Sequence, residues 1–127
     1  MVKGLALPNE VGMTVPYCAP EYLVQIQSGK PILCTDLHRK ADVYSYAIMI
    51  CELMSKSCPW DLPNALAIRE AVISGKRTAV RFHPIYGTGS KKQGDLNRLK
   101  QIVELAWVQD AALRPSMERI IELLEAK

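Results

Sequence analysis

The sequence predicts a single, mainly α-helical domain, and three observations support this fold class. Apolar residues recur at helical spacing in several segments of the 127-residue chain. No segment has the pattern of a convincing strand. Residues 40–54 are apolar on almost every face of a helix, and a helix of this kind is normally buried. We therefore expect other helices to pack around a central helix at 41–54.

The composition is that of an ordinary globular protein, with 49% hydrophobic residues, 23% charged residues and a formal net charge of +3. It argues against disorder, a coiled coil or collagen, and the length allows one domain with a modest core. The 4 cysteines contain no C-x-x-C pair, so free thiols in a reducing compartment are expected rather than zinc or disulfides. No signal-peptide pattern begins the chain, and a cytoplasmic location is the expectation.

The N-terminal part is expected to be irregular up to residue 18, because Pro8, Gly12 and Pro16 interrupt any helix. A short helix then begins near Pro20, which suits a first helical turn. Glu21 suits the positive end of the helix dipole. Residues 27–38 are expected to form a loop that leads to the central helix.

The central helix at 41–54 carries three apolar rows, which predict burial on all sides. It is too short for a membrane span, and it carries Asp42 and Glu52. Asp42 is unusual, because a carboxylate at the start of a buried helix needs hydrogen-bond donors. Backbone N–H groups of a neighbouring loop, or of the first turn of the helix itself, could supply them.

Further helices are expected toward the C-terminus. One spans 64–75, with Asn64 as its N-cap and Gly75 as the left-handed residue that ends it. A basic loop at 76–94 follows. Apolar residues then recur at helical spacing over 95–108 and 116–126, which predicts two C-terminal helices.

The charge of the chain is concentrated in residues 76–100, which hold seven basic residues against one aspartate, a net charge of +6. Such a block could attract an acidic partner, but a solvated loop and helix face is the interpretation we favour. The glycines between residues 87 and 94 lack the spacing of a nucleotide-binding P-loop. His38 and His83 have no partners at the spacing of a zinc site or a catalytic triad.

Three segments carry motifs in a fixed order. Residues 14–21 match the pattern T-x-x-Y-x-A-P-E, residues 42–47 resemble D-V-Y/W-S-F/Y-G, and residues 107–116 resemble W-x-x-D-P-x-x-R-P-S. Together, across residues 4–127, they resemble the C-terminal lobe of a eukaryotic protein kinase. The sequence around the motifs is most similar to the tyrosine-kinase-like group of serine/threonine kinases. The resemblance implies a partial kinase domain over residues 1–127, with an activation segment at 4–21.

The resemblance also implies roles for single residues. Glu21 would pair with Arg114 and so tie the activation segment to the last helices. Asp42 would accept hydrogen bonds from the backbone of the catalytic loop. Thr14 and Tyr17 would lie in the P+1 loop, which contacts the residue after the phosphoacceptor. The remaining structural positions are Ala19, Pro20 and Trp107.

The chain departs from the family pattern where catalysis is concerned. Kinase catalysis uses a Gly-rich loop, a β3 lysine and an H-R-D-L-x-x-x-N loop, and the sequence contains none of them. Residues 2–6 align with the D-F-G-L-A region, but Val2 stands where the Mg²⁺-binding aspartate is expected. Ala47 replaces the usual glycine and Ala111 the usual proline, which are mild changes. The resemblance therefore implies a helical C-lobe portion of the protein-kinase-like fold, with the N-lobe and catalytic loop absent.

The expected function follows from these matches and departures. The parent activity is transfer of the ATP γ-phosphate to a protein serine or threonine. ATP and Mg²⁺ are implied for the complete family domain, while no catalytic, cofactor or metal residue is expected in this chain. The alternative is a non-catalytic, pseudokinase-like scaffold or interaction module. The expected partners are proteins, with neither nucleic acid nor membrane, and exposed apolar surface could cause self-association.

Overall fold

The computed structural model describes residues 15–29, 36–58, 60–86 and 89–126. All regular structure within these ranges is helical, so the mainly α-helical fold class is confirmed. The five α-helices are α2 Pro20–Ser28, α3 Asp36–Ser55, α4 Ala65–Ile73, α5 Ser90–Ala106 and α6 Met117–Glu125. Three short 3₁₀ helices are η1 Val15–Tyr17, η2 Pro84–Tyr86 and η3 Ala111–Leu113. In this described part, no helix is long and apolar enough to cross a membrane.

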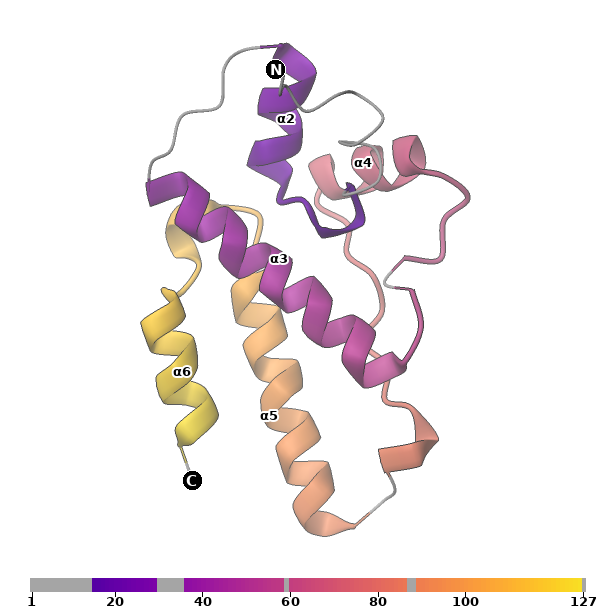
Figure 1. The fold of residues 1–127 in the computed structure, drawn as a ribbon, viewed down its shortest axis with the longest axis vertical. Helices are drawn as coiled ribbons and strands as arrows, with labels where there is room; N and C mark the ends of the chain where they lie inside the picture. The colour runs from indigo at the N-terminus through magenta and orange to yellow at the C-terminus, as the bar shows by residue number, and fades with distance from the viewer. Residues whose placement is uncertain (1–14, 30–35, 59, 87–88, 127) are drawn as a thin grey trace, which may run out of the picture.

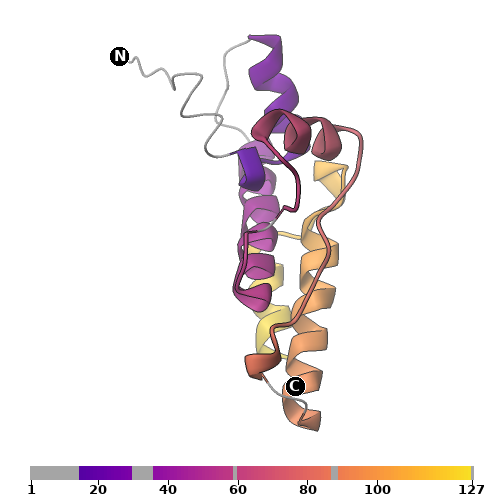
Figure 2. The same ribbon diagram turned by 90° about the vertical axis from the view of Figure 1, so that its right-hand side faces the viewer.

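The longest helix, α3, is the element on which the others are arranged. It crosses the molecule diagonally, with α2 and α4 beside each other toward one end and α5 and α6 toward the other (Figure 1). The view turned by 90° shows the same division along the long axis of the molecule (Figure 2). The helices therefore pack on α3 from more than one side, as the apolar residues of 40–54 predict.

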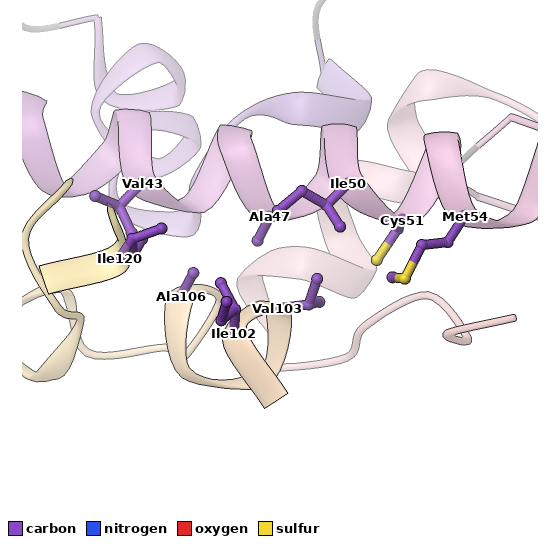
Figure 3. Packing of buried hydrophobic residues seen from close by; sticks show 9 residues of the cluster. All are labelled: Val43, Ala47, Ile50, Cys51, Met54, Ile102, Val103, Ala106 and Ile120. Carbon is purple, nitrogen blue, oxygen red and sulfur yellow. The ribbon is translucent and has the colours of Figure 1, made fainter. Parts of the chain in front are cut away.

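Two clusters of buried side chains form the core, and α3 contributes to both. One cluster joins α3 to α5 and α6 and contains Ala47, Ile102, Val103 and Ile120 (Figure 3). The other joins α3 to η1, α2 and α4. Trp107 packs against both clusters. Complete burial of an aliphatic side chain contributes about 1.5–3 kcal/mol, so each cluster is a substantial part of the stability of the fold.

The prediction that α3 is buried on all sides is wrong for one of its three apolar rows. Met49 is 41% exposed and Leu53 is 61% exposed, while Tyr46 in the same row is half-buried. No other element of the described part covers this face. The helix also begins at Asp36 rather than at Ala41, because nothing between residues 36 and 40 interrupts a helix.

The caps expected for α4 are present. The Asn64 side chain accepts a hydrogen bond from the Ala67 N–H at 2.9 Å, as an N-cap does. Gly75 has a φ of +99° and donates to the Val72 carbonyl, while the next N–H, of Lys76, donates to the Ala71 carbonyl. This pair of hydrogen bonds is a Schellman motif, which ends the helix at Ile73.

The basic loop is shorter than 76–94, because α5 begins at Ser90 rather than at Asp95. Gly94 therefore lies inside the helix, where a glycine is unfavourable by about 1 kcal/mol relative to alanine but does not break the helix. The last helix, α6, is Met117–Glu125, and its N-cap Ser116 accepts from the Arg119 N–H at 3.1 Å. The two C-terminal helices thus lie where the apolar spacing predicts them, with a different start for α5.

Candidate functional site

A buried ion pair joins the first turn of α2 to the segment between η3 and α6. The guanidinium of Arg114 donates from Nη1 to Oε2 of Glu21 at 2.7 Å and from Nη2 to Oε1 at 2.8 Å. The Arg114 side chain is 0% exposed and that of Glu21 is 26% exposed. A bidentate pair of this kind fixes the relative orientation of its two elements as well as their separation. It is the pair that the motif positions predict.

The other N–H groups of Arg114 are also used, all by backbone carbonyls. Nε donates to Val108 at 2.9 Å, Nη1 to Lys40 at 2.9 Å and Nη2 to Gln109 at 3.4 Å. In return, the Lys40 ammonium donates to the Arg114 carbonyl. With these bonds and the two to Glu21, all of the guanidinium N–H groups have an acceptor. Arg114 therefore connects α2, the start of α3 and the turn after α5.

The ring of Tyr44, on α3, lies between two guanidinium groups. The Arg77 guanidinium carbon is 5.0 Å from the ring centroid and that of Arg114 is 5.3 Å from it. Both distances are within the range of a cation–π interaction. Tyr44 is 0% exposed, and its hydroxyl has no hydrogen-bond partner among the described residues. Burial raises the pKa of Tyr44 to about 12.

Arg77 fastens the end of α4 to the turn after α5. Its Nε donates to the Trp107 carbonyl at 2.8 Å and its Nη2 to Oε1 of Gln109 at 2.7 Å. The Gln109 Nε2 in turn donates to the Ile73 carbonyl at 3.1 Å. Burial lowers the pKa of Arg77, because a half-buried guanidinium loses hydration. Its acceptors here are neutral oxygens, so its charge is not neutralised by a bonded carboxylate in the described part.

The short helix η1 is held in place by side chains from two other segments. The Tyr17 hydroxyl donates to Oε1 of Glu52 at 2.6 Å, and the Ser45 hydroxyl donates to the Tyr17 carbonyl at 2.6 Å. Trp60 Nε1 donates to the Pro16 carbonyl at 3.2 Å. The hydrogen bond to Glu52, together with burial, raises the pKa of Tyr17 to about 12. The conformation of η1 is thus determined by α3 and by the segment before α4.

Asp42 does not occupy the environment expected for it. The side chain is exposed, and it lines an open groove of about 710 Å³ together with Tyr46, Met49, Glu52 and other residues of α3, η1 and α6. The role that the resemblance implies for Asp42, accepting hydrogen bonds from the catalytic loop, stays a prediction, because this sequence contains no such loop. Because α3 begins at Asp36, Asp42 lies in its second turn, on the face that no described element covers.

The predicted positions fall into three groups. Glu21 and Arg114 form an ion pair with each other. Ala19 and Pro20, which directly precede Glu21 in the sequence, are buried. Trp107 is half-buried, and its carbonyl accepts a hydrogen bond from Arg77. Tyr17 lies on η1. Thr14 and Val2 lie outside the described residues. These positions gather around η1 and α2, except Asp42, which faces the open groove.

The sequence did not reveal Arg77 and Tyr44 as partners of Arg114. Arg77 belongs to the basic loop expected at 76–94, and no spacing rule relates it to residues of α3. Tyr44 has helical spacing within an apolar row, which predicts burial but not a position between two cations. Lys40, which exchanges hydrogen bonds with Arg114, likewise carries no signal of its own.

The described residues offer no site for a metal ion. No group of three or more His, Cys, Asp or Glu side chains in these ranges is arranged to hold one. Asp42 and Glu52 share the groove on α3, but the groove brings no third ligand of this kind. The contacts above fix η1, the start of α2 and the segment after η3 against α3.

Comparison with known proteins agrees with the motif order. A family model described as "Protein tyrosine and serine/threonine kinase" matches residues 8–124. Serine/threonine-protein kinase STY17 of Arabidopsis thaliana is 33% identical over 88 residues, covering 67% of this chain and 13% of that protein. Serine/threonine-protein kinase 12 of Arabidopsis thaliana is 26% identical over 119 residues, covering 82% of this chain and 24% of that protein.

A relative from an animal gives a similar picture. Serine/threonine-protein kinase mos of Xenopus laevis is 26% identical over 117 residues, covering 92% of this chain and 28% of that protein. The chain therefore spans between 13% and 28% of the length of these three relatives.

Proposed function

The chain belongs to the protein tyrosine and serine/threonine kinase family, and from that premise we propose that it is the C-lobe segment of a protein serine/threonine kinase. The activity to which it contributes is transfer of the ATP γ-phosphate to a serine or threonine of a protein. The observation that carries the proposal is the Glu21–Arg114 ion pair, at 2.7 and 2.8 Å. The T-x-x-Y-x-A-P-E motif ends at Glu21, in the first turn of α2, and the ion pair ties this turn to the segment between η3 and α6.

The contribution of this segment is to position the protein substrate. The backbone of η1 is fixed by hydrogen bonds from Ser45 and Trp60 and by the Tyr17 hydroxyl. A rigid backbone at this point would hold the residue after the phosphoacceptor, with Thr14 and Tyr17 in contact with it. Such positioning accounts for much of the rate of a phosphoryl transfer.

The residues present do not fit ATP or Mg²⁺. Mg²⁺ bound with phosphates takes one or two carboxylates and keeps near-octahedral geometry. Asp42 and Glu52 line one groove, but no group of three or more His, Cys, Asp or Glu side chains that could hold a metal ion is found among the described residues. The sequence also lacks the Gly-rich loop, the β3 lysine and the H-R-D loop that hold the nucleotide in this family. We propose that the isolated 127-residue chain is inactive and that a complete domain supplies the nucleotide site.

A second candidate function is a non-catalytic interaction module. The observation that favours it is the uncovered face of α3, where Met49 is 41% exposed and Leu53 is 61% exposed. Met117 and Ile121 of α6 are exposed as well. Met49 and Met117 line the same groove, and exposed apolar surface favours association. In sedimentation velocity, we expect the isolated chain to self-associate, and Leu53→Gln to raise its monomer fraction; a chain that stays monomeric at high concentration would contradict this.

The two functions are distinguished by completing the domain. The chain is joined in frame to the preceding part of a serine/threonine kinase domain that ends with D-F-G, and transfer to a serine peptide is measured with radiolabelled ATP. Transfer above a heat-killed control is expected, with a large loss for Arg114→Ala and none for Arg119→Ala, an exposed arginine. A joined protein that unfolds cooperatively but transfers no phosphate would contradict the kinase assignment and favour the interaction module.

A further inference from the structure

We propose that the pocket between α4 and its two flanking segments binds an acidic segment of the protein substrate. The pocket encloses about 630 Å³. The pocket is lined by apolar and charged side chains, among them Trp60, Asp61, Leu62, Glu70, Arg77 and Arg81. In Figure 2, α4 lies across the upper part of this side of the molecule, and the segments that precede and follow it run down from its two ends.

The positive charges of the pocket come from one wall. Lys76, Arg77 and Arg81 all belong to the segment that follows α4. Arg77 is held in place by its bonds to Trp107 and Gln109, and no carboxylate bonds to it in the described part. Lys76 and Arg81 are exposed, and the side chain of neither has a hydrogen bond or ion pair to a described residue. Lys76 and Arg81 are thus available to a carboxylate in this pocket, while Arg77, whose Nη1 also donates to the Val72 and Lys76 carbonyls, adds its positive charge to the same wall.

The negative charges come from other segments than the positive ones. Asp61 precedes α4 and Glu70 lies on α4 itself. The pocket thus has its basic and acidic groups on different segments, with an excess of one positive charge overall. An incoming carboxylate would be attracted to the wall formed by residues 76–81 and repelled by Asp61 and Glu70, which fixes the direction in which a peptide lies. The apolar rings and methyl groups of Trp60, Leu62 and the alanines of the pocket would cover the aliphatic part of the segment.

The pocket is also adjacent to η1. Trp60 lines the pocket and donates from its Nε1 to the Pro16 carbonyl at 3.2 Å. A polypeptide that crosses η1 therefore reaches the pocket across a single side chain. For this reason we assign the pocket to the protein substrate rather than to a small anion. The inference rests on the proposed function only in treating the bound segment as part of a substrate.

The test is a titration of the 127-residue chain with a labelled peptide, followed by fluorescence anisotropy at low salt. The peptide carries a serine, two leucines and three glutamates; a second peptide has glutamine in place of each glutamate. Tighter binding of the glutamate peptide is expected. Arg81→Glu should weaken that binding about tenfold, since a favourable contact becomes repulsive. Glu70→Gln should strengthen it about twofold, because it removes a repulsion of the size of an exposed charge pair.

Lys100→Glu is the matched control, because it makes the same charge change on an exposed residue of α5, which is not among the residues that line the pocket. It should leave the affinity within about twofold, apart from a long-range effect that salt screens. Equal weakening by Arg81→Glu and Lys100→Glu, equal affinity for the two peptides, or an unchanged affinity for Arg81→Glu would overturn the proposal. In the joined kinase domain, transfer without any preference for glutamate would refute the pocket assignment alone. Absence of transfer with intact peptide binding would refute the proposed function alone.

Discussion

Arg114 is a buried cation in a fold that offers it one carboxylate and several carbonyls. Burial of a charge is costly unless hydrogen bonds and an opposite charge replace the lost water. Glu21 and the carbonyls of Lys40, Val108 and Gln109 supply this compensation. The consequence is that each partner depends on the other. Removal of either leaves a buried group without its partner.

The first prediction concerns this dependence. Arg114→Ala should lower the free energy of unfolding by about 3–5 kcal/mol, because Glu21 keeps a partly buried charge without a counter-ion. Arg119→Ala should have little effect, since Arg119 pairs with Glu122 on the surface and both side chains are more than half exposed. Urea unfolding of the two variants measures the difference. Equal midpoints for both would mean that the buried pair is not a structural tie.

A second prediction separates the ring of Tyr44 from its hydroxyl. The hydroxyl has no acceptor in the described part, so Tyr44→Phe should leave stability unchanged or slightly raised. Tyr44→Leu should lower it, because two cation–π contacts are lost, each worth about 0.5–2 kcal/mol. Thermal unfolding followed by circular dichroism gives the comparison. A large loss of stability for Tyr44→Phe would show that the hydroxyl has a partner of consequence.

At the scale of the elements, two glycines differ in the backbone conformation that their positions require: Gly75 follows the end of α4, and Gly94 lies inside α5. Gly75 ends α4 with a φ of +99°, where any residue with a Cβ is strained, although no atom lies within 4 Å of the added carbon. Gly94 lies inside α5, also with open space around it. The environment is the same in both cases, and only the backbone differs.

Alanine at these two positions should therefore change stability in opposite directions. Gly75→Ala should cost about 1–2 kcal/mol, the penalty of the left-handed conformation. Gly94→Ala should stabilise the protein by about 1 kcal/mol, because glycine is a poor residue for a helix interior. Midpoints of chemical unfolding for the two variants would test this. A shift in the same direction for both would contradict the observed helix bounds.

The local signals of the sequence predict the elements well where capping chemistry is complete. Asn64 and Gly75 mark the limits of α4, and the structure has both caps. The start of α3 was placed too late, because Ser28, Gly29 and Pro31 indicate a loop but do not say where it ends. The start of α5 was placed too late as well, because Gly94 is unfavourable in a helix without being excluded from one.

The candidate site was likewise predicted from the sequence only in part. The Glu21–Arg114 pair could be expected from motif positions, since both residues stand in recognisable patterns. The interactions of Arg77 could not, because they depend on how the segment after α4 passes Tyr44 in three dimensions. The exposed positions on α3, such as Asp42 and Met49, could not be identified from the sequence for a different reason. Helical periodicity predicts which side chains share a face, but not whether another element covers that face.

Among the described residues, buried clusters lie on two sides of α3, and another face of this helix is open to solvent. The described helices bury residues of η1, α2 and α4 on one part of α3, and residues of α5 and α6 on another. The remaining face carries Asp42, Met49 and Leu53. The chain spans between 13% and 28% of the relatives with which it was compared. Our account is that this segment supplies a platform for a protein substrate and no site for the nucleotide.

The measurement that tests this account most directly is isothermal calorimetry of the 127-residue chain with Mg·ATP. No saturable heat is expected, because no three potential metal ligands come together among the described residues and the sequence has no phosphate-binding loop. Cooperative urea unfolding of the same sample shows that the chain is folded. Saturable binding of Mg·ATP in the micromolar range would contradict the account and require a nucleotide site of a different design.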